Sequence, residues 1–226
     1  SFDEIEVAIP PLDEQRRIAE VLRSVDEAVT ATEAAINAAV LVRQCALDAL
    51  MRDLVEAAEE KLHVLSEVAE VRTGLAKNKN ADGRHIRLPY LRVANVQDGW
   101  FDLSDMQEID VEPEKVDRYS LKAGDVLLTE GGDYDKLGRG GVWRAQVDPC
   151  LHQNHVFCVR ADPARLLPDF LALVTQSFLG RSYFLSCAKR TTNLASINSS
   201  QLKSLPLPVP DLEQQREIVA EIGCMG

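Results

Sequence analysis

Apolar residues recur in alternating steps of three and four along the first quarter of the chain. This spacing is the heptad seam of a coiled coil, sustained for about five heptads. The seam consists of Ile18, Leu22, Val25, Val29, Ile36, Val40, Leu47, Leu50 and Leu54, with Thr32 and Arg43 as interruptions. The pattern predicts a long helix over residues 10–63 whose narrow apolar stripe needs a second helix to cover it.

The start of this predicted helix is repeated later in the chain. Residues 9–22, IPPLDEQRRIAEVL, align with residues 209–222, VPDLEQQREIVAEI. Residues 1–9 and 201–209 also align, so both suit the same place on a folded domain. We expect 201–209 to occupy that place in cis, and 1–9, the tail of a preceding unit, to be loose or docked on another chain. Residues 209–226 then begin a second helix.

Residues 64–208 have the pattern of an α/β (α+β) domain of about 140 residues, a normal domain size. Short β-like runs separated by Gly, Asp and Asn turns predict strands at 87–94, 125–129, 141–145 and 155–160. A helix is predicted over 168–185, with Gly180 as a candidate break. Three alternating prolines, Pro206, Pro208 and Pro210, close the domain.

Composition narrows the class of protein. No apolar run approaches the ~20 residues of a membrane span, and no secretion signal opens the chain, so no membrane partner is expected. Five scattered cysteines predict a reducing, cytoplasmic location without disulfides. The net charge of −11 argues against nucleic acid as a partner. The acidity, however, belongs almost entirely to residues 1–70, whereas residues 72–92 and 181–203 are basic and favour an anion-binding face.

Three loops carry the candidate chemistry. Residues 129–141, TEGGDYDKLGRGG, follow an apolar strand, and their glycines allow a ligand to approach the backbone, although no phosphate-loop motif is present. Residues 150–158, CLHQNHVFC, contain zinc-capable side chains but lack finger spacing, so amide contacts to base edges are favoured over a metal. Residues 189–200, KRTTNLASINSS, suit phosphate contacts. No catalytic motif is found, so catalysis is the weakest interpretation of the residues alone.

These pieces together resemble the specificity subunit of type I DNA restriction-modification systems. The resemblance rests on the head Pro11-Leu12-x-Glu14-Gln15-Arg16-x-Ile18 and its second copy around residues 212–218. It is supported by 127–140, by 152–155 and by 192–197, and it covers essentially the whole chain.

The resemblance implies a non-catalytic subunit whose target recognition domain reads one half of a bipartite DNA site. It also implies that DNA adenine methyltransferase subunits, which bind S-adenosylmethionine themselves, are positioned by this chain, and that restriction-translocase subunits join some complexes. No cofactor is expected in this chain. Only one recognition domain is present, so we expect a second copy or another specificity chain to pair with the long helix, from Ile18 to Leu54.

The residues expected at the DNA share polar, basic or glycine character in the loops named above. Contacts with phosphates or bases are predicted for Lys77, Lys79, Arg92, Lys136, Arg139 and Arg190. Base readout is assigned to Glu130, Gln153, Asn154 and Asn193. The remaining DNA-binding candidates are Asn78, Asn95, Thr129, Gly131, Gly132, Asp133, His152, His155, Thr191 and Thr192.

Two other classes stay open on the residues alone. A coiled-coil adaptor whose α/β domain binds a protein or small ligand is favoured by the net acidity, and salt-dependent duplex binding would decide against it. A metal-dependent enzyme built on 150–158 is the weaker alternative, and elemental analysis of the purified protein would test it.

Overall fold

The computed structural model describes residues 9–58, 61–76, 84–132, 137–190 and 195–225, with Arg190 described for its backbone alone. These residues divide into two compact units, and the boundary in the sequence lies between Arg43 and Gln44. The expected extended segment at 1–9 lies outside the described residues, except for Ile9. The α/β class and the long N-terminal helix predicted from the sequence are confirmed.

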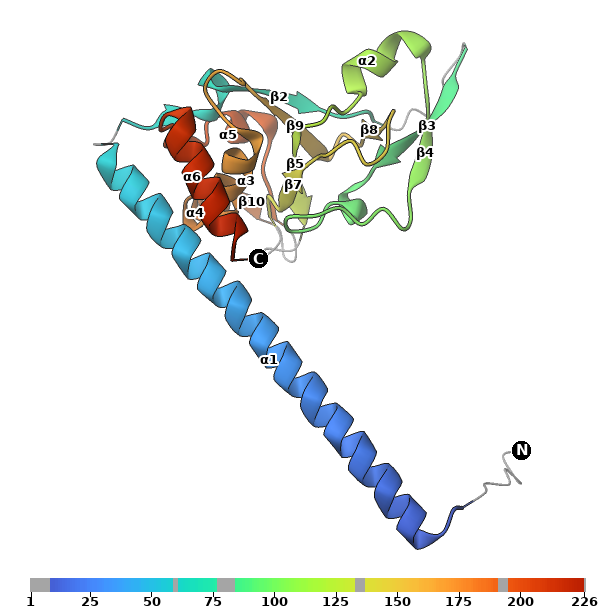
Figure 1. Cartoon of the computed structure of the whole chain (residues 1–226). Coiled ribbons are helices and arrows are strands. Elements are labelled where there is room, and N and C mark those ends of the chain that lie inside the picture. The colour runs from blue at the N-terminus through green and yellow to red at the C-terminus, as the bar shows by residue number, and fades with distance from the viewer. Residues whose placement is uncertain (1–8, 59–60, 77–83, 133–136, 191–194, 226) are drawn as a thin grey trace. The chain divides into compact units, whose positions relative to one another are not determined.

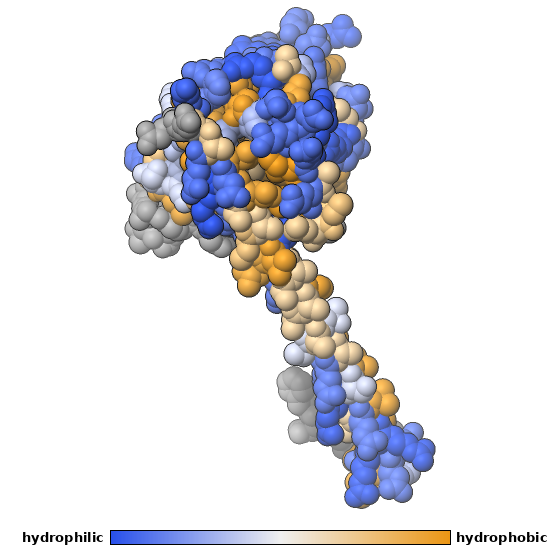
Figure 2. Space-filling model, turned by 60° about the vertical axis from the view of Figure 1, so that its left-hand side comes forward, coloured by the Kyte–Doolittle hydropathy of each residue, from blue (hydrophilic) through white to orange (hydrophobic). Residues whose placement is uncertain are grey.

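The first unit is most of the helix α1 (Leu12–Ala57), whose first turn contains Asp13 and Glu14. Acidic side chains in a first turn stabilise the positive end of the helix dipole. The helix ends six residues before the predicted end at 63. Figure 2 shows apolar residues gathered along it.

The predicted seam of α1 divides into two parts. Its first six members are about half exposed or more, from 47% for Ile18 to 63% for Val40. Leu47 and Leu54 are instead buried in the core of the second unit, and Leu50 packs against that core. The expectation that these three side chains face a partner helix is therefore wrong, because the domain itself covers them.

By length and composition alone, α1 is also a candidate membrane span, with a mean hydropathy of 1.4 in its most apolar window. The burial of Leu47 and Met51 in a protein core gives this part of the helix another explanation.

The second unit, residues 44–225, contains four small sheets and most of the helices (Figure 1). The largest sheet has the order β2-β9-β5-β7 and is antiparallel throughout. Its strands are β2 (Ala69–Thr73), β9 (Val156–Ala161), β5 (Val126–Thr129) and β7 (Gly140–Val142).

The other three sheets are short. One has the order β4-β3-β8 and consists of β4 (Gln107–Val111), β3 (Ile86–Leu91) and β8 (Leu151–His152). Another has the order β10-β11-β6 and consists of β10 (Lys189–Arg190), β11 (Ala195–Ser196) and β6 (Gly131–Gly132). The last pairs β1 (His63–Val64) with β12 (Pro206–Leu207).

The helices that follow α1 are short, with 4 to 12 residues each. They comprise α2 (Val116–Tyr119), α3 (Pro168–Gln176), α4 (Phe178–Cys187), α5 (Ser199–Lys203) and α6 (Leu212–Gly223), with 3-10 turns η1 (Leu65–Glu67), η2 (Val93–Asn95) and η3 (Pro113–Lys115). The predicted helix at 168–185 is broken at Ser177, whose side chain caps α4, and not at Gly180. A Cβ at Gly180 would come within 2.6 Å of the Thr175 carbonyl oxygen, so this glycine serves close packing of the two helices.

The main sheet is covered on both faces. Along β5, Val126 and Leu128 face a core shared with α3, α4 and α6, whereas Leu127 between them faces a second cluster around Trp143. This alternation is the period of two that a strand imposes.

The closing segment 201–209 packs onto the domain in cis, as expected from its alignment with 1–9. Leu202, Leu205 and Leu207 are fully buried. Antiparallel pairing of β12 with β1 brings the start and the end of the domain together.

Candidate nucleic-acid interface

Three strand ends of the main sheet lie at one edge. Because β9 is antiparallel to both β2 and β5, its start lies beside their ends, with Thr73 opposite Phe157 and Thr129 opposite Val156. The segments that follow β2 and β5 therefore meet the segment that precedes β9. These are three of the segments in which the sequence predicts DNA-binding residues.

Backbone hydrogen bonds hold residues 152–155 against the end of β2. The Leu75 N–H donates to the His152 carbonyl at 2.8 Å, and the Asn154 N–H donates to the Leu75 carbonyl at 3.1 Å. A Cβ at Gly74 would come within 2.1 Å of the His152 carbonyl oxygen. Glycine at this position therefore permits the two segments to touch.

The glycine-rich stretch is joined to the third predicted loop. Gly131 pairs with Ser196 and Gly132 with Ala195. Glu130, the residue before this pairing, accepts a hydrogen bond from the Ile197 N–H at its carbonyl and donates its own N–H to the His155 carbonyl, both at 2.9 Å. Residues 74–75, 130–132, 152–155 and 195–197 thus form one continuous surface, which we call the loop-end surface.

A contact between the side chains of Glu130 and His155 lies in the loop-end surface. Glu130 contacts the Nδ1 atom of His155, and the Asn154 side-chain amide lies 3.4 Å from His155 Nε2. The two ionisable side chains are 30% and 55% exposed, respectively. Carboxylate, imidazole and amide groups in one row offer both acceptors and donors, which is what reading base edges requires.

Three predicted DNA-binding residues are buried, which corrects their expected role. The His152 side chain is 2% exposed, its Nδ1 lies 2.7 Å from the Val156 carbonyl, and its burial lowers its pKa. Asn95, 3% exposed, donates to the carbonyls of Asp102 and Asp105. Thr129 is fully buried. These side chains present almost no surface to a ligand. His152 and Asn95 instead contact backbone carbonyl groups of the loops.

The predicted basic residues differ in their surroundings. Arg92 donates to both the backbone carbonyl and the carboxylate of Asp105, at 2.8 Å each, and this hydrogen bond lowers the pKa of Asp105. Arg139 is half-buried and forms no ion pair with another described residue. Gln153 is also half-buried, and its side-chain oxygen lies 3.4 Å from the Val93 N–H.

Several predicted residues have no described placement. These residues are Lys77, Asn78, Lys79, Asp133, Lys136, Thr191, Thr192 and Asn193, together with the side chain of Arg190. Their predicted contacts with DNA stay predictions.

The cysteines of 150–158 are buried in the apolar cluster around Trp143. Burial raises the pKa of Cys150 to about 12 and raises that of Cys158 as well. Both thiols therefore stay protonated at neutral pH, whereas a metal needs the thiolate. Within the described ranges no group of three His, Cys, Asp or Glu side chains is arranged to hold a metal ion.

Sequence reasoning missed a basic hollow beside β2. It measures about 580 Å³ and is lined by Arg72, Arg118, Lys122 and Arg160, against two acids, Glu70 and Asp117. Part of this charge is already matched, since Arg160 binds the buried Asp125 carboxylate through two contacts of 2.7 Å. These residues come from three segments that are separate in the sequence, so no local motif predicted the hollow.

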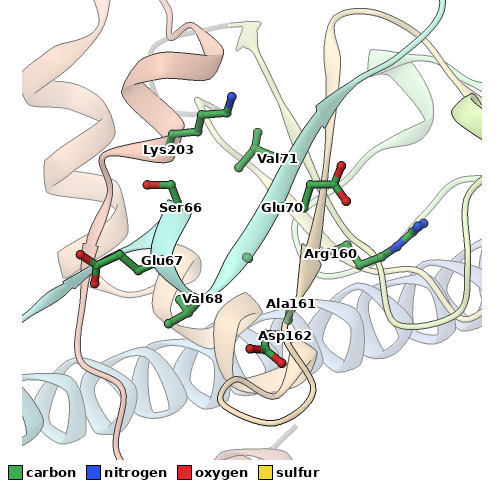
Figure 3. Close-up of a pocket in the computed structure, with 10 residues that line it drawn as sticks. Ser66, Glu67, Val68, Glu70, Val71, Arg160, Ala161, Asp162 and Lys203 are labelled. Atoms are coloured by element: carbon green, nitrogen blue, oxygen red, sulfur yellow. The ribbon is translucent and has the colours of Figure 1, made fainter.

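A second hollow, of about 630 Å³, lies along the other part of β2 (Figure 3). Its charged residues are Glu67, Glu70 and Asp162 against Arg160 and Lys203. This mixed lining with an acidic excess does not suit a phosphate.

A family model and two curated relatives match this chain, and all three are described as type I restriction specificity proteins. The family described as the type I restriction modification DNA specificity domain matches residues 1–41 and 61–222. The EcoKI specificity subunit of Escherichia coli strain K12 is 29% identical over 98% of this chain and 51% of that protein. The StySPI specificity subunit of Salmonella potsdam is 26% identical over 98% of this chain and 50% of that protein.

The fold is also found among solved structures. The HsdS subunit from Thermoanaerobacter tengcongensis superposes with a TM-score of 0.54 at 22% identity, over 96% of this chain and 51% of that one. At that identity the likeness concerns the fold alone. The chain spans about half the length of each of these three relatives.

Proposed function

The chain belongs to the type I restriction modification DNA specificity family, and from this premise we propose that it reads one half of a bipartite DNA site and positions DNA adenine methyltransferase subunits on it. The chain itself supplies recognition, whereas the methyltransferase subunits supply the S-adenosylmethionine site and the catalytic groups. The observation that carries the proposal is the meeting of four sequence-distant segments in the loop-end surface.

The geometry of the loop-end surface supports DNA as its ligand. The side chains of Glu130, Asn154 and His155 form a row at the edge of the sheet, with His155 exposed and the other two half-buried. Arg139, also half-buried, lies at the other end of residues 130–139. A site built on strand ends keeps the spacing of its side chains fixed, which base readout needs. The hollow lined by Arg72, Arg118 and Lys122 is a further place for a phosphate.

Salt-dependent DNA binding separates this proposal from an adaptor that binds a protein or small ligand. Affinity for a duplex, measured by fluorescence anisotropy at several salt concentrations, should fall steeply with salt. Replacing Arg139 by Gln should weaken all sequences alike and lower the salt slope by about 1.

Lys115→Gln is the matched control for Arg139→Gln. Lys115 is 49% exposed and follows the end of β4. The end of β4 pairs with the start of β3, whereas residues 152–153 contact Leu91 at the opposite end of β3. We expect it to leave affinity and salt slope unchanged. Equal effects of the two substitutions, or binding indifferent to salt, would contradict the proposal.

We further propose that the exposed seam of α1 pairs with a helix of another specificity chain. Side chains from Val25 to Val40 are 50% to 63% exposed, which is unfavourable for apolar groups in a row. If the partner is a second copy, the two domains read an inverted, split site. Light scattering of the chain alone should then give the mass of a dimer, and a stable monomer at micromolar concentration would exclude self-pairing.

A further inference from the structure

Trp100 is a large apolar side chain on the surface of the second unit. Its exposed fraction is 58%, whereas the other tryptophan of the chain, Trp143, is fully buried. An indole ring offers a large apolar area for contact, and tryptophan is enriched among the residues that dominate binding interfaces. The exposed Trp100 is therefore a candidate for contact with a ligand.

Trp100 belongs to a tight turn, residues 96–101, whose ends pair in an antiparallel bridge. Gly99 in this turn has a φ of +85°, in the left-handed region that favours glycine. Phe101, the next residue along the chain, is only 8% exposed, and its ring lies edge-on to that of Trp143 at 5.4 Å. The turn is thus anchored in the core by Phe101, while the neighbouring indole stays in solvent.

Two contacts hold the turn against the rest of the domain. The Gly99 N–H donates to the Gly140 carbonyl at 2.8 Å, and Arg181 of α4 forms an ion pair with Asp98 at 3.2 Å. Trp100 is therefore presented from a fixed backbone. A side chain on a fixed backbone loses less conformational freedom on binding than one on a loose loop.

The turn lies at the same end of the main sheet as the loop-end surface. Gly140 begins β7, and the residue before it, Arg139, accepts a hydrogen bond from the N–H of Thr129, the last residue of β5, at 3.0 Å. The turn therefore extends this edge beyond β7, the last strand of the sheet. At about 4.8 Å between neighbouring strands, it lies three steps, or about 14 Å, from the start of β9.

This spacing is close to the width of the major groove of B-DNA, which is about 12 Å. When residues 154–155, at the start of β9, enter such a groove, Trp100 lies near its opposite wall. The wall presents deoxyribose carbons, base edges and thymine methyl groups. These groups are partly apolar and suit contact with an indole ring.

The surroundings of Trp100 favour a duplex over a protein as its partner. The core of a protein interface is an apolar patch with several members. In the described part of residues 44–225, the other exposed large hydrophobic residues are Val64, Ile86 and Met225. They lie in β1, at the start of β3 and after α6, so none of them extends the surface around Trp100 into a patch.

We propose that the Trp100 indole packs against the DNA duplex, at the wall of the groove that Glu130, Asn154 and His155 read. The inference rests on the proposed function, since it takes the loop-end surface as the side that faces DNA. The contact involves no charge, so it strengthens binding without releasing counterions. In this respect Trp100 differs from Arg139, whose replacement lowers the salt slope.

Fluorine NMR of the full chain labelled with fluorotryptophan tests the proposal. The chain has two tryptophans, so Trp100→Phe identifies the resonance of Trp100. A pool of random-sequence duplexes should shift this resonance and leave that of the buried Trp143 in place. The unlabelled methyltransferase subunit, added without DNA, should shift neither resonance.

Affinity for the same duplex pool gives a second readout. Trp100→Ala should weaken binding about tenfold with an unchanged salt slope, and Trp100→Phe less than about threefold, because a ring remains. Ile86→Ala, 36% exposed at the start of β3, is the matched control and should bind as the unaltered chain does.

The outcomes separate this inference from the proposed function. Salt-dependent binding with an unmoved Trp100 resonance, or with equal affinity for Trp100→Ala and the unaltered chain, would overturn the inference and leave the proposed function standing. A Trp100 resonance that the methyltransferase subunit shifts without DNA would assign the ring to that protein and also overturn the inference. Binding that does not depend on salt would remove the proposed function and this inference together.

Discussion

Replacing Gly74 by Ala should break the contact on which the loop-end surface depends. The new Cβ would lie 2.1 Å from the His152 carbonyl oxygen and 2.4 Å from that of Gln153, both of them backbone atoms. To reach ordinary contact, the end of β2 and residues 152–153 must separate by about 1 Å. That displacement strains the two hydrogen bonds that Leu75 makes with His152 and Asn154.

The expected loss follows from those two bonds. At about 1 kcal/mol net for each buried backbone hydrogen bond, Gly74→Ala should lower the free energy of unfolding by about 2 kcal/mol. Urea denaturation followed by tryptophan fluorescence measures it, because Trp143 is fully buried in the cluster that contains Val156 and Cys158. Under conditions where the variant is folded, DNA affinity should also fall, by about 1–3 kcal/mol, since Gln153 and Asn154 move.

Gly132→Ala is the matched control for Gly74→Ala. A Cβ at Gly132 meets no atom of the described residues within 4 Å, and the φ of Gly132 is not in the left-handed region. Its stability should match or slightly exceed that of the unaltered chain, because alanine restricts the unfolded state. If Gly74→Ala is as stable as Gly132→Ala, the close contact between β2 and residues 152–153 is wrong.

Three further predictions concern stability. Gln215→Ala should lower the free energy of unfolding by about 2–4 kcal/mol, because it leaves the Leu167 N–H and the Arg165 C=O unpaired. Gln15→Ala should leave it unchanged, because Gln15 is exposed. Equal losses for the two variants in urea denaturation would contradict the buried position of Gln215. Leu47→Ala should cost about 2–5 kcal/mol and Leu22→Ala, 59% exposed, much less, by the same measurement. Burial lowers the pKa of His152, so below the ordinary histidine pKa of about 6.5 the unfolded chain binds a proton more readily than the folded one. The free energy of unfolding is therefore highest above that pH and falls as the pH drops below it. His152→Gln should lose less stability than the unaltered chain between pH 7.5 and pH 5.5, and identical pH profiles would refute this.

Much of the fold follows from local sequence patterns. The heptad spacing located α1, and the repeat placed Leu202, Leu205 and Leu207 against the domain in cis. Periodicity shows which face of a helix is apolar but not what covers it. The same seam is therefore exposed at Val25 and buried in a domain core at Leu47.

The candidate site was harder to predict than the fold, because residue type does not reveal burial. His152, Asn95 and Thr129 have the chemistry of ligand contacts, yet each is held in the interior. Gly74 was assigned no role from the sequence, since its close contact comes from a segment almost 80 positions later. The basic hollow beside β2 was missed for the same reason, as Arg72 and Arg118 are brought together only by the fold.

Selection of duplexes from a random pool tests the central claim most directly. The chain is co-expressed with its methyltransferase subunit, and the bound DNA is sequenced for the unaltered chain and for Asn154→Ala. The account predicts one enriched motif for the unaltered chain and the relaxation of a single position in that motif for the variant, because the half-buried Asn154 amide lies beside the exposed His155. No enriched motif, or an identical motif for both chains, would contradict recognition through the loop-end surface.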